Sequence, residues 1–147
     1  MSSLVLVVRH RELKAIYGVW VEKCAGETLP TAASFEPGDL RGWLSHIALV
    51  SMARDGAPRY DFFGDGLATA FGLDLTGLTL DSLPDGRRDV LEDDYRRVAE
   101  TCLPVARVVT DRFNAGDPET WEALLLPLFD DDASVAKVLA AMYPLDR

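Results

Sequence analysis

The chain opens with apolar residues at helical spacing. Six of them recur every three or four positions between residues 9 and 24, namely Leu13, Ile16, Tyr17, Trp20, Val21 and Cys24. This period places them on one face of an amphipathic helix. Gly26 is a suitable end for the helix, and the prolines at 30 and 37 predict a connecting loop. We therefore expect an N-terminal helix and loop over residues 1–35 and a core domain over 36–147.

Shorter apolar runs rich in β-branched and aromatic residues predict strands. They cover residues 46–52, 59–64, 105–113 and 120–128, and Asp55-Gly56 between the first two predicts an antiparallel hairpin. Residues 135–143 are ambiguous, because their alanines favour a helix. Their position directly after the predicted turn Asp130–Asp132 favours a closing strand instead. We predict that this segment is the fifth antiparallel strand.

The middle of the chain has helical character. The clearest helix is predicted over residues 89–102, where Asp89 and Glu92 form an Asp variant of the capping box. Two shorter helices are expected around 40–44 and 67–71. Strands at both ends of a helical middle predict an α+β fold, in which one five-stranded antiparallel sheet carries helices on one face.

Charge and length exclude several classes of function. The 147 residues predict one domain, and a net charge of −9 argues against binding to nucleic acid or to an anionic membrane. No run approaches the roughly 20 apolar residues of a membrane span. The apolar run Leu4–Val8 is too short for a signal peptide. Cys24 and Cys102 are expected to be reduced thiols, so we expect a cytoplasmic protein.

Candidate chemistry is sparse. His10 and His46 are the only histidines, and the two cysteines do not complete a structural zinc set. Asp130-Asp131-Asp132 lacks the alternating spacing of a calcium loop. No nucleophile, P-loop or zinc-protease motif occurs. We expect a protein that is not an enzyme and that binds no metal.

Four sequence motifs stand in the order and spacing of one known family. They are RYDFFGD at 59–65, FGLDLTG at 71–77, YRRVAET at 95–101 and LLLPL at 124–128. Together with Trp20, Pro30 and Pro37, they resemble the PAS domain, and in particular a group of short single-domain bacterial PAS proteins. The similarity extends from about Arg9 to the end of the chain.

This resemblance implies a non-enzymatic sensory or interaction module. PAS domains hold a small ligand, or nothing, between the concave face of the sheet and the helices, and we expect this one to act in trans on a signalling partner protein. A PAS haem site uses a histidine from the helical middle, and residues 67–102 contain none. Cys102 lies at the end of the long helix, where a flavin photosensor does not place its cysteine. We therefore expect no cofactor.

Aromatic residues are the candidates for a ligand pocket. If the polar side chains of Asp61 and Glu122 face outward, strand alternation turns their neighbours inward. The expected pocket is lined by Tyr60, Phe62, Phe71 and Trp121. It would take a small apolar ligand. The alternative is a structural protein–protein adaptor in which these rings fill the core and no ligand binds.

The N-terminal stripe also suggests self-association. It is wide enough to pack on a sheet and still to offer apolar surface to a second copy. We therefore expect a homodimer whose interface includes Leu13, Ile16, Tyr17 and Trp20.

Overall fold

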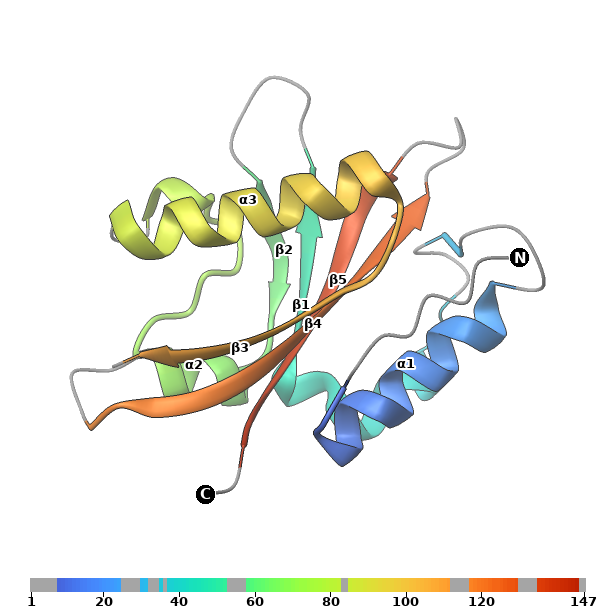
Figure 1. Ribbon diagram of the computed structural model, residues 1–147, viewed down its shortest axis with the longest axis horizontal. Coiled ribbons are helices and arrows are strands. Elements are labelled where there is room, and N and C mark those ends of the chain that lie inside the picture. Colours follow the sequence, from blue (N-terminus) through green and yellow to red (C-terminus); the bar gives the residue numbers. More distant parts are fainter. Residues whose placement is uncertain are drawn as a thin grey trace.

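A single antiparallel sheet is the centre of the molecule (Figure 1). The computed structural model describes residues 8–24, 30–31, 35, 37–52, 58–82, 85–111, 117–129 and 135–145, and of residues 37, 85–90, 111, 135 and 136 it describes the backbone alone. Within them, five strands lie in the order β2-β1-β5-β4-β3. They are β1 (Ile47–Ser51), β2 (Arg59–Phe63), β3 (Val105–Asp111), β4 (Glu119–Phe129) and β5 (Val135–Pro144).

The predicted α+β fold is confirmed, and so are the five antiparallel strands. The predicted strand end at 112–113 lies outside the described residues. So do Gly26 and the predicted turns at Asp55-Gly56 and Asp130–Asp132.

The ambiguous last segment forms the central strand of the sheet. β5 pairs with β1 on one side and with β4 on the other. Ala140 and Ala141 are fully buried, one on each face. Tertiary pairing on both edges therefore overrides the helix propensity of the alanines, since propensity is a weak prior against such burial.

A β-bulge interrupts the hairpin of β1 and β2. Leu49 pairs with Phe62 and Val50 with Tyr60, so that Asp61 is an extra residue opposite β1. A bulge turns two consecutive side chains toward the same face of a sheet and breaks the alternation beyond it. The orientation of every side chain in β2 therefore depends on this one insertion.

One face of the sheet, which we call the inner face, is covered by α2 (Asp65–Phe71), η3 (Leu80–Ser82) and α3 (Asp85–Thr101). The predicted end of α2 is confirmed, because Gly72 adopts the left-handed conformation that closes a helix, with φ of 76°. The long helix α3 contacts both β4 and β5.

The predicted start of α3 at Asp89 is wrong. The helix begins at Asp85, one turn earlier, and therefore runs through Gly86. A glycine inside a helix costs about 1 kcal/mol relative to alanine. Burial of Tyr95 and Val98 on the sheet-facing side of α3 contributes more than this, because a fully buried large side chain is worth about 1.5–3 kcal/mol.

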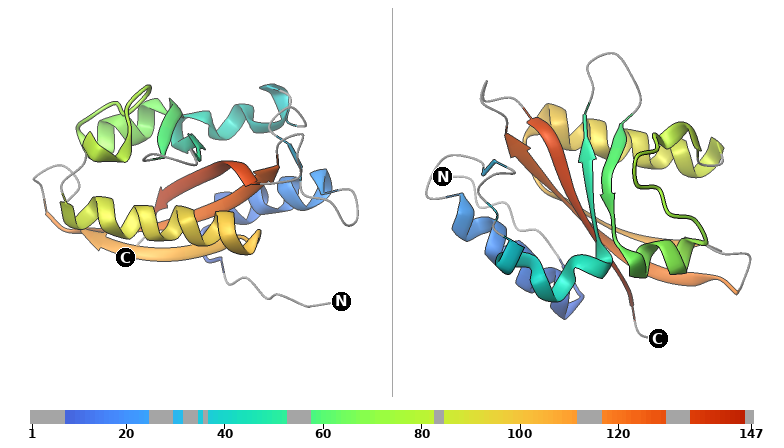
Figure 2. Two further views of the ribbon diagram at one scale, coloured as in Figure 1. Left: turned by 90° about the horizontal axis from the view of Figure 1, so that it is seen from above. Right: turned by 180° about the vertical axis from the view of Figure 1, so that it is seen from behind.

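The opposite face, which we call the outer face, carries α1 (Arg11–Lys23) and the 3₁₀-helix η2 (Pro37–His46). The rear view in Figure 2 shows these two helices side by side, with α3 on the far side of the strands. The expectation of helices on one face thus holds for α2 and α3, while the N-terminal helix covers the other face.

Gly64, between β2 and α2, packs tightly against backbone. A Cβ at this position would lie 2.3 Å from the carbonyl oxygen of Leu44 and 2.4 Å from that of Ser45. We expect Gly64→Ala to lower the free energy of unfolding by about 2–3 kcal/mol, because backbone must move to admit the methyl group. Gly18→Ala is the control, since a Cβ at Gly18 in α1 meets no atom within 4 Å. In urea unfolding, Gly18→Ala should be more stable than the wild-type chain. Equal changes in the free energy of unfolding for Gly64→Ala and Gly18→Ala would contradict the tight packing at Gly64.

Candidate functional site

The inner face holds a continuous series of aromatic rings between the sheet and the helices. The ring centroids of Tyr60 and Phe63 are 5.3 Å apart, those of Phe63 and Phe71 are 5.9 Å apart, and those of Phe71 and Trp121 are 5.8 Å apart. At the other end of the series, the ring centroid of Tyr95 in α3 lies 6.3 Å from that of Tyr60. These separations are those of rings in direct contact.

Two phenols, those of Tyr60 and Tyr95, are buried at one end of this series. The hydroxyl oxygens of Tyr60 and Tyr95 lie 2.9 Å apart, so one phenol donates a hydrogen bond to the other across the interface of α3 and β2. Burial raises the pKa of Tyr60 to about 12, and it raises the pKa of Tyr95 well above the ordinary value. Both side chains are therefore neutral, and the pair can be buried without an uncompensated charge.

The predicted pocket residues do not share one face. Tyr60, Phe71 and Trp121 lie in or against the inner core, as expected. The predicted inward orientation of Phe62 is wrong, because Phe62 follows the bulge and lies on the outer face with 39% of its surface exposed. Phe63 takes the inner position instead, and a strict alternation from Asp61 could not identify it.

Asp61 is held on the outer face by two neighbouring strands. Lys137 of β5 donates a hydrogen bond to its Oδ2 atom over 2.5 Å, and the Ser51 hydroxyl of β1 donates to the same oxygen. Lys137 Nζ also lies 3.1 Å from Ser51 Oγ. Burial by itself would raise the pKa of Asp61, but these bonds and the nearby positive charges lower it below its ordinary value. The carboxylate is therefore charged, and the bonds stabilise the bulge.

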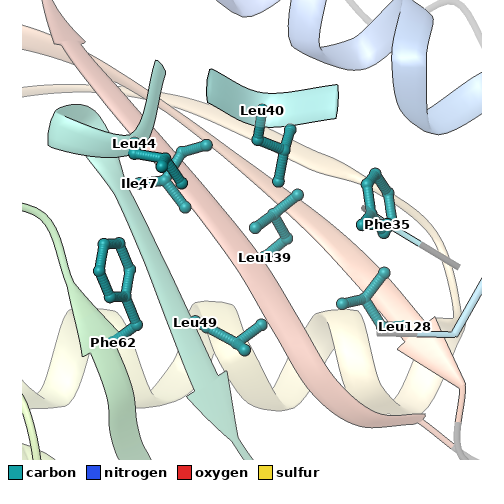
Figure 3. Close-up of a pocket in the computed structure, with 8 residues that line it drawn as sticks. All are labelled: Phe35, Leu40, Leu44, Ile47, Leu49, Phe62, Leu128 and Leu139. Atoms are coloured by element: carbon teal, nitrogen blue, oxygen red, sulfur yellow. The ribbon is translucent and has the colours of Figure 1, made fainter. Parts of the chain in front are cut away.

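An open groove lies on the outer face (Figure 3). It has a volume of about 210 Å³, and its walls are eight apolar side chains: Phe35, Leu40, Leu44, Ile47, Leu49, Phe62, Leu128 and Leu139. Figure 3 shows them arranged around Leu139. Leu44 and Phe62 remain 41% and 39% exposed. No sequence pattern indicated this groove, because its walls come from distant segments.

Most of the predicted dimer surface packs against other residues of the same chain. Leu13, Ile16 and Trp20 are buried in the outer-face core, and Trp20 Nε1 donates to the carbonyl oxygen of Pro127 over 3.0 Å. These three side chains therefore pack against their own sheet. Tyr17, half-buried, stacks on Trp20 at 6.0 Å, and Val21 is exposed. The homodimer itself stays a prediction.

A buried carboxylate anchors the start of α1. Glu122 of β4 accepts hydrogen bonds from the backbone N–H groups of Arg9, over 2.9 and 3.0 Å, and of His10, over 2.7 Å. The predicted outward orientation of Glu122 is correct, but α1 covers this side chain almost completely. His10 then caps the helix, because its Nδ1 atom accepts from the N–H of Glu12.

Both histidines stack on one tyrosine of β5. The ring centroid of His10 lies 4.6 Å from that of Tyr143, and the ring centroid of His46 lies 4.2 Å from it. The Nδ1 atom of His46 also lies 2.9 Å from the hydroxyl oxygen of Ser45. This arrangement joins the start of α1, the end of η2 and β5.

This stack makes stability depend on pH near neutrality. Burial lowers the pKa of His46, and the charge of His10 lowers it further. As the pH falls, His46 therefore takes up a proton in the unfolded chain before it does so in the folded chain. The contribution of His46 to the free energy of unfolding is complete above about pH 6.5 and is lost as the pH falls below it. We expect the free energy of unfolding to decrease from about pH 7.5 to about pH 5.5, and His46→Phe to weaken this dependence. Urea unfolding across this range measures it, and an unchanged dependence in His46→Phe would contradict the assignment.

Outside these contacts, the described residues hold few candidates for chemistry. No group of three or more His, Cys, Asp or Glu side chains among them is arranged to hold a metal ion. In the same part of the chain, no helix is long and apolar enough to cross a membrane. An ion pair of Asp94 on α3 and Arg107 on β3, 2.5 Å apart, links helix and sheet.

Comparisons with known proteins find the same fold in solved structures. The solved structures that resemble the chain include the PAS domain of BvgS from Bordetella pertussis, with 18% identity over 72% of this chain and 80% of that one and a TM-score of 0.57. Another is a sensory box sensor histidine kinase from Vibrio cholerae, with 13% identity, coverage of 75% and 89% and a TM-score of 0.54. A third is a fungal LOV domain photoreceptor, with 17% identity, coverage of 88% and 91% and a TM-score of 0.53. At such identities the likeness shows the fold alone.

The sequence comparisons are more decisive. No curated protein matches the chain. A family model described as PAS domain matches residues 8–143, which include α1 and all five strands. The chain therefore belongs to the PAS domain family of sensory and signalling domains.

Proposed function

We propose that this PAS domain is a non-enzymatic interaction module that acts in trans on a signalling partner protein, with an inner core filled by its own side chains. The observation that carries the proposal is the unbroken contact of the rings from Tyr95 to Trp121. A ligand between sheet and helices would have to separate rings whose centroids are about 5–6 Å apart. The filled-core alternative thus has more support than a small-molecule pocket on this face.

Two further observations support a role in protein contact. The structures of similar fold include one described as a sensor histidine kinase, and we infer a signalling partner of that class. The groove of the outer face also leaves Leu44 and Phe62 partly exposed. These two side chains are accessible to a partner protein.

Native mass spectrometry of the protein isolated from its own cells tests the filled core. We expect masses that correspond to the polypeptide alone, or to twice its mass if the predicted homodimer forms. A small molecule whose retention is lost on replacement of Phe71 or Trp121, but not of Leu44 in the outer groove, would contradict the proposal. That result would favour ligand sensing on the inner face instead.

A further inference from the structure

The two edges of the sheet, β2 and β3, differ in how their backbone groups are satisfied (Figure 1). At the β2 edge the chain returns along the strand. The N–H of Tyr60 donates to the carbonyl oxygen of Leu78 over 2.9 Å, and the carbonyl oxygen of Tyr60 accepts from Gly77 over 2.7 Å. The N–H of Leu80 donates to the carbonyl oxygen of Pro58 over 3.0 Å. This edge is therefore covered by the protein's own backbone.

The hydrogen bonds of β4 show which backbone groups of β3 face the opposite edge. The N–H of Leu145 donates to the carbonyl oxygen of Thr120 over 2.9 Å, so Thr120 directs its backbone groups toward β5. In an antiparallel strand the N–H and C=O of one residue point to the same side, and the side alternates along the strand. Thr110 stands opposite Thr120 and therefore directs its own groups away from β4. The same holds for Val108 and Ala106, at intervals of two residues.

Where β4 continues past the end of β3, its edge is satisfied. The carbonyl oxygen of Pro127 accepts from Trp20 Nε1 over 3.0 Å. The N–H of Phe129 donates to the carbonyl oxygen of Pro30 over 2.9 Å. Among the residues that the structure describes, the unpaired backbone of this edge is thus confined to β3.

β3 also lacks several features that keep edge strands apart. Natural edge strands are blunted by short length, by proline, by lysine or by bulges. Val105–Asp111 is seven residues long, contains neither proline nor lysine, and pairs with β4 without a bulge. Val108, at its centre, is 44% exposed on the outer face. The outward N–H and C=O groups of Ala106, Val108 and Thr110 have no protein partner within the described ranges.

We propose that β3 pairs antiparallel with β3 of a second copy of this chain, with Val108 opposite Val108 of the partner subunit. In this register Ala106 faces Thr110 of the partner subunit, and Thr110 faces the partner's Ala106. The outward residues of both strands then meet, and residues that face each other in this way exchange both of their hydrogen bonds. Every outward N–H and C=O of the three residues is thereby satisfied. The strand is self-complementary about Val108, which is why a second copy is the occupant.

The charges of the strand permit this pairing. Like charges directly opposite each other destabilise paired strands. Arg107 would stand opposite Val109 of the partner subunit, and its own charge is already engaged by Asp94 on α3. The expected homodimer is thus assigned to β3 instead of the N-terminal stripe, most of which packs on its own sheet. The proposal goes beyond the function above and does not depend on the filled inner core.

Sedimentation equilibrium of the full chain tests the pairing. The contact is smaller than a standard protein interface, so we expect a dimer that dissociates at about 10–100 µM. Val108→Pro removes an N–H that faces away from β4, and proline is tolerated at such edge positions. This variant should keep its unfolding midpoint in urea and dimerise at least about tenfold more weakly. A wild-type chain that stays monomeric at about 1 mM, or a folded Val108→Pro variant that dimerises as tightly as the wild type, would overturn the proposal.

Charged variants of Val108 test the register, because this residue stands opposite itself only in the proposed pairing. Val108→Lys and Val108→Glu should each dimerise about five- to tenfold more weakly than the wild type, since like charges then face each other. An equimolar mixture of the two should associate at least as tightly as the wild-type chain, a gain that misfolding cannot produce. A mixture that associates no better than either variant alone would overturn the proposal.

Val21→Lys and Val21→Glu are the matched controls. Val21 is also an exposed valine, but it belongs to the N-terminal stripe on α1. Both variants should dimerise as the wild type does. Loss of the dimer in these variants, with the Val108 variants unaffected, would place the interface on α1 and overturn the assignment to β3. Failure of these tests would remove this proposal alone, since the filled inner core is tested through Phe71 and Trp121.

Discussion

Phe63→Ala is expected to lower the free energy of unfolding by about 3–5 kcal/mol, as measured by urea or guanidinium unfolding. The ring of Phe63 is almost fully buried and lies between those of Tyr60 and Phe71. Its removal leaves a cavity in the inner core that the surrounding rings cannot close, and the cavity adds to the lost burial of the side chain. The loss should appear as a lower denaturation midpoint with an unchanged slope.

Phe62→Ala is the matched control for this prediction. It removes the same atoms from the neighbouring position, but on the outer face, where the ring is 39% exposed. We expect a loss of about 1 kcal/mol or less. Equal losses in the two variants would mean that Phe62 also supports the core, and the division of the two faces by the bulge would then be wrong.

Arg107→Met is expected to cost about 3 kcal/mol in the free energy of unfolding. Asp94 is only 3% exposed, and Arg107 Nη2 lies 2.5 Å from its carboxylate. Methionine preserves much of the volume of the side chain but leaves a buried carboxylate without its partner. Such an uncompensated charge is far more costly than the net value of the intact pair.

Two further variants separate charge burial from other causes. Arg96→Met breaks the ion pair with Glu92 on the exposed side of α3, whose closest atoms are 2.7 Å apart, and should cost less than about 0.5 kcal/mol. The double variant Asp94→Leu/Arg107→Met should recover most of the lost stability, because no charge remains buried. If the double variant were as unstable as Arg107→Met, packing of the arginine stem would be the cause.

Two polar pairs cross the interface of α3 with the sheet. They are the Tyr60–Tyr95 pair and the Asp94–Arg107 pair. A rearrangement of α3 would leave buried polar groups unsatisfied at both places. The outer face is different, since its groove is open and two of its apolar side chains are partly exposed. A partner or ligand that binds there pays no such penalty.

The sequence by itself determined most elements of this fold and their order, although it left residues 135–143 ambiguous between helix and strand. The period of the N-terminal stripe corresponds to α1, and the β-branched and aromatic runs correspond to the strands. Short-range physics is sufficient for these features, because helical and extended backbones repeat every 3.6 and 2 residues. The motifs RYDFFGD and FGLDLTG also contain Gly64, which admits no Cβ, and Gly72, which has a positive φ. The resemblance to the PAS family rested on such positions.

Only the tertiary structure decided which side chains meet. The bulge at Asp61 places Phe63, not Phe62, in the inner core. Asp61 accepts hydrogen bonds from Ser51 and Lys137, which belong to two other strands. The N-terminal stripe packs on its own sheet. Glu122 can be buried because its carboxylate accepts hydrogen bonds from the backbone N–H groups of Arg9 and His10. Each of these outcomes depends on residues far apart in the chain. A local periodic pattern contains no information about such partners, so the orientation of a side chain next to a bulge is decided only when the sheet forms.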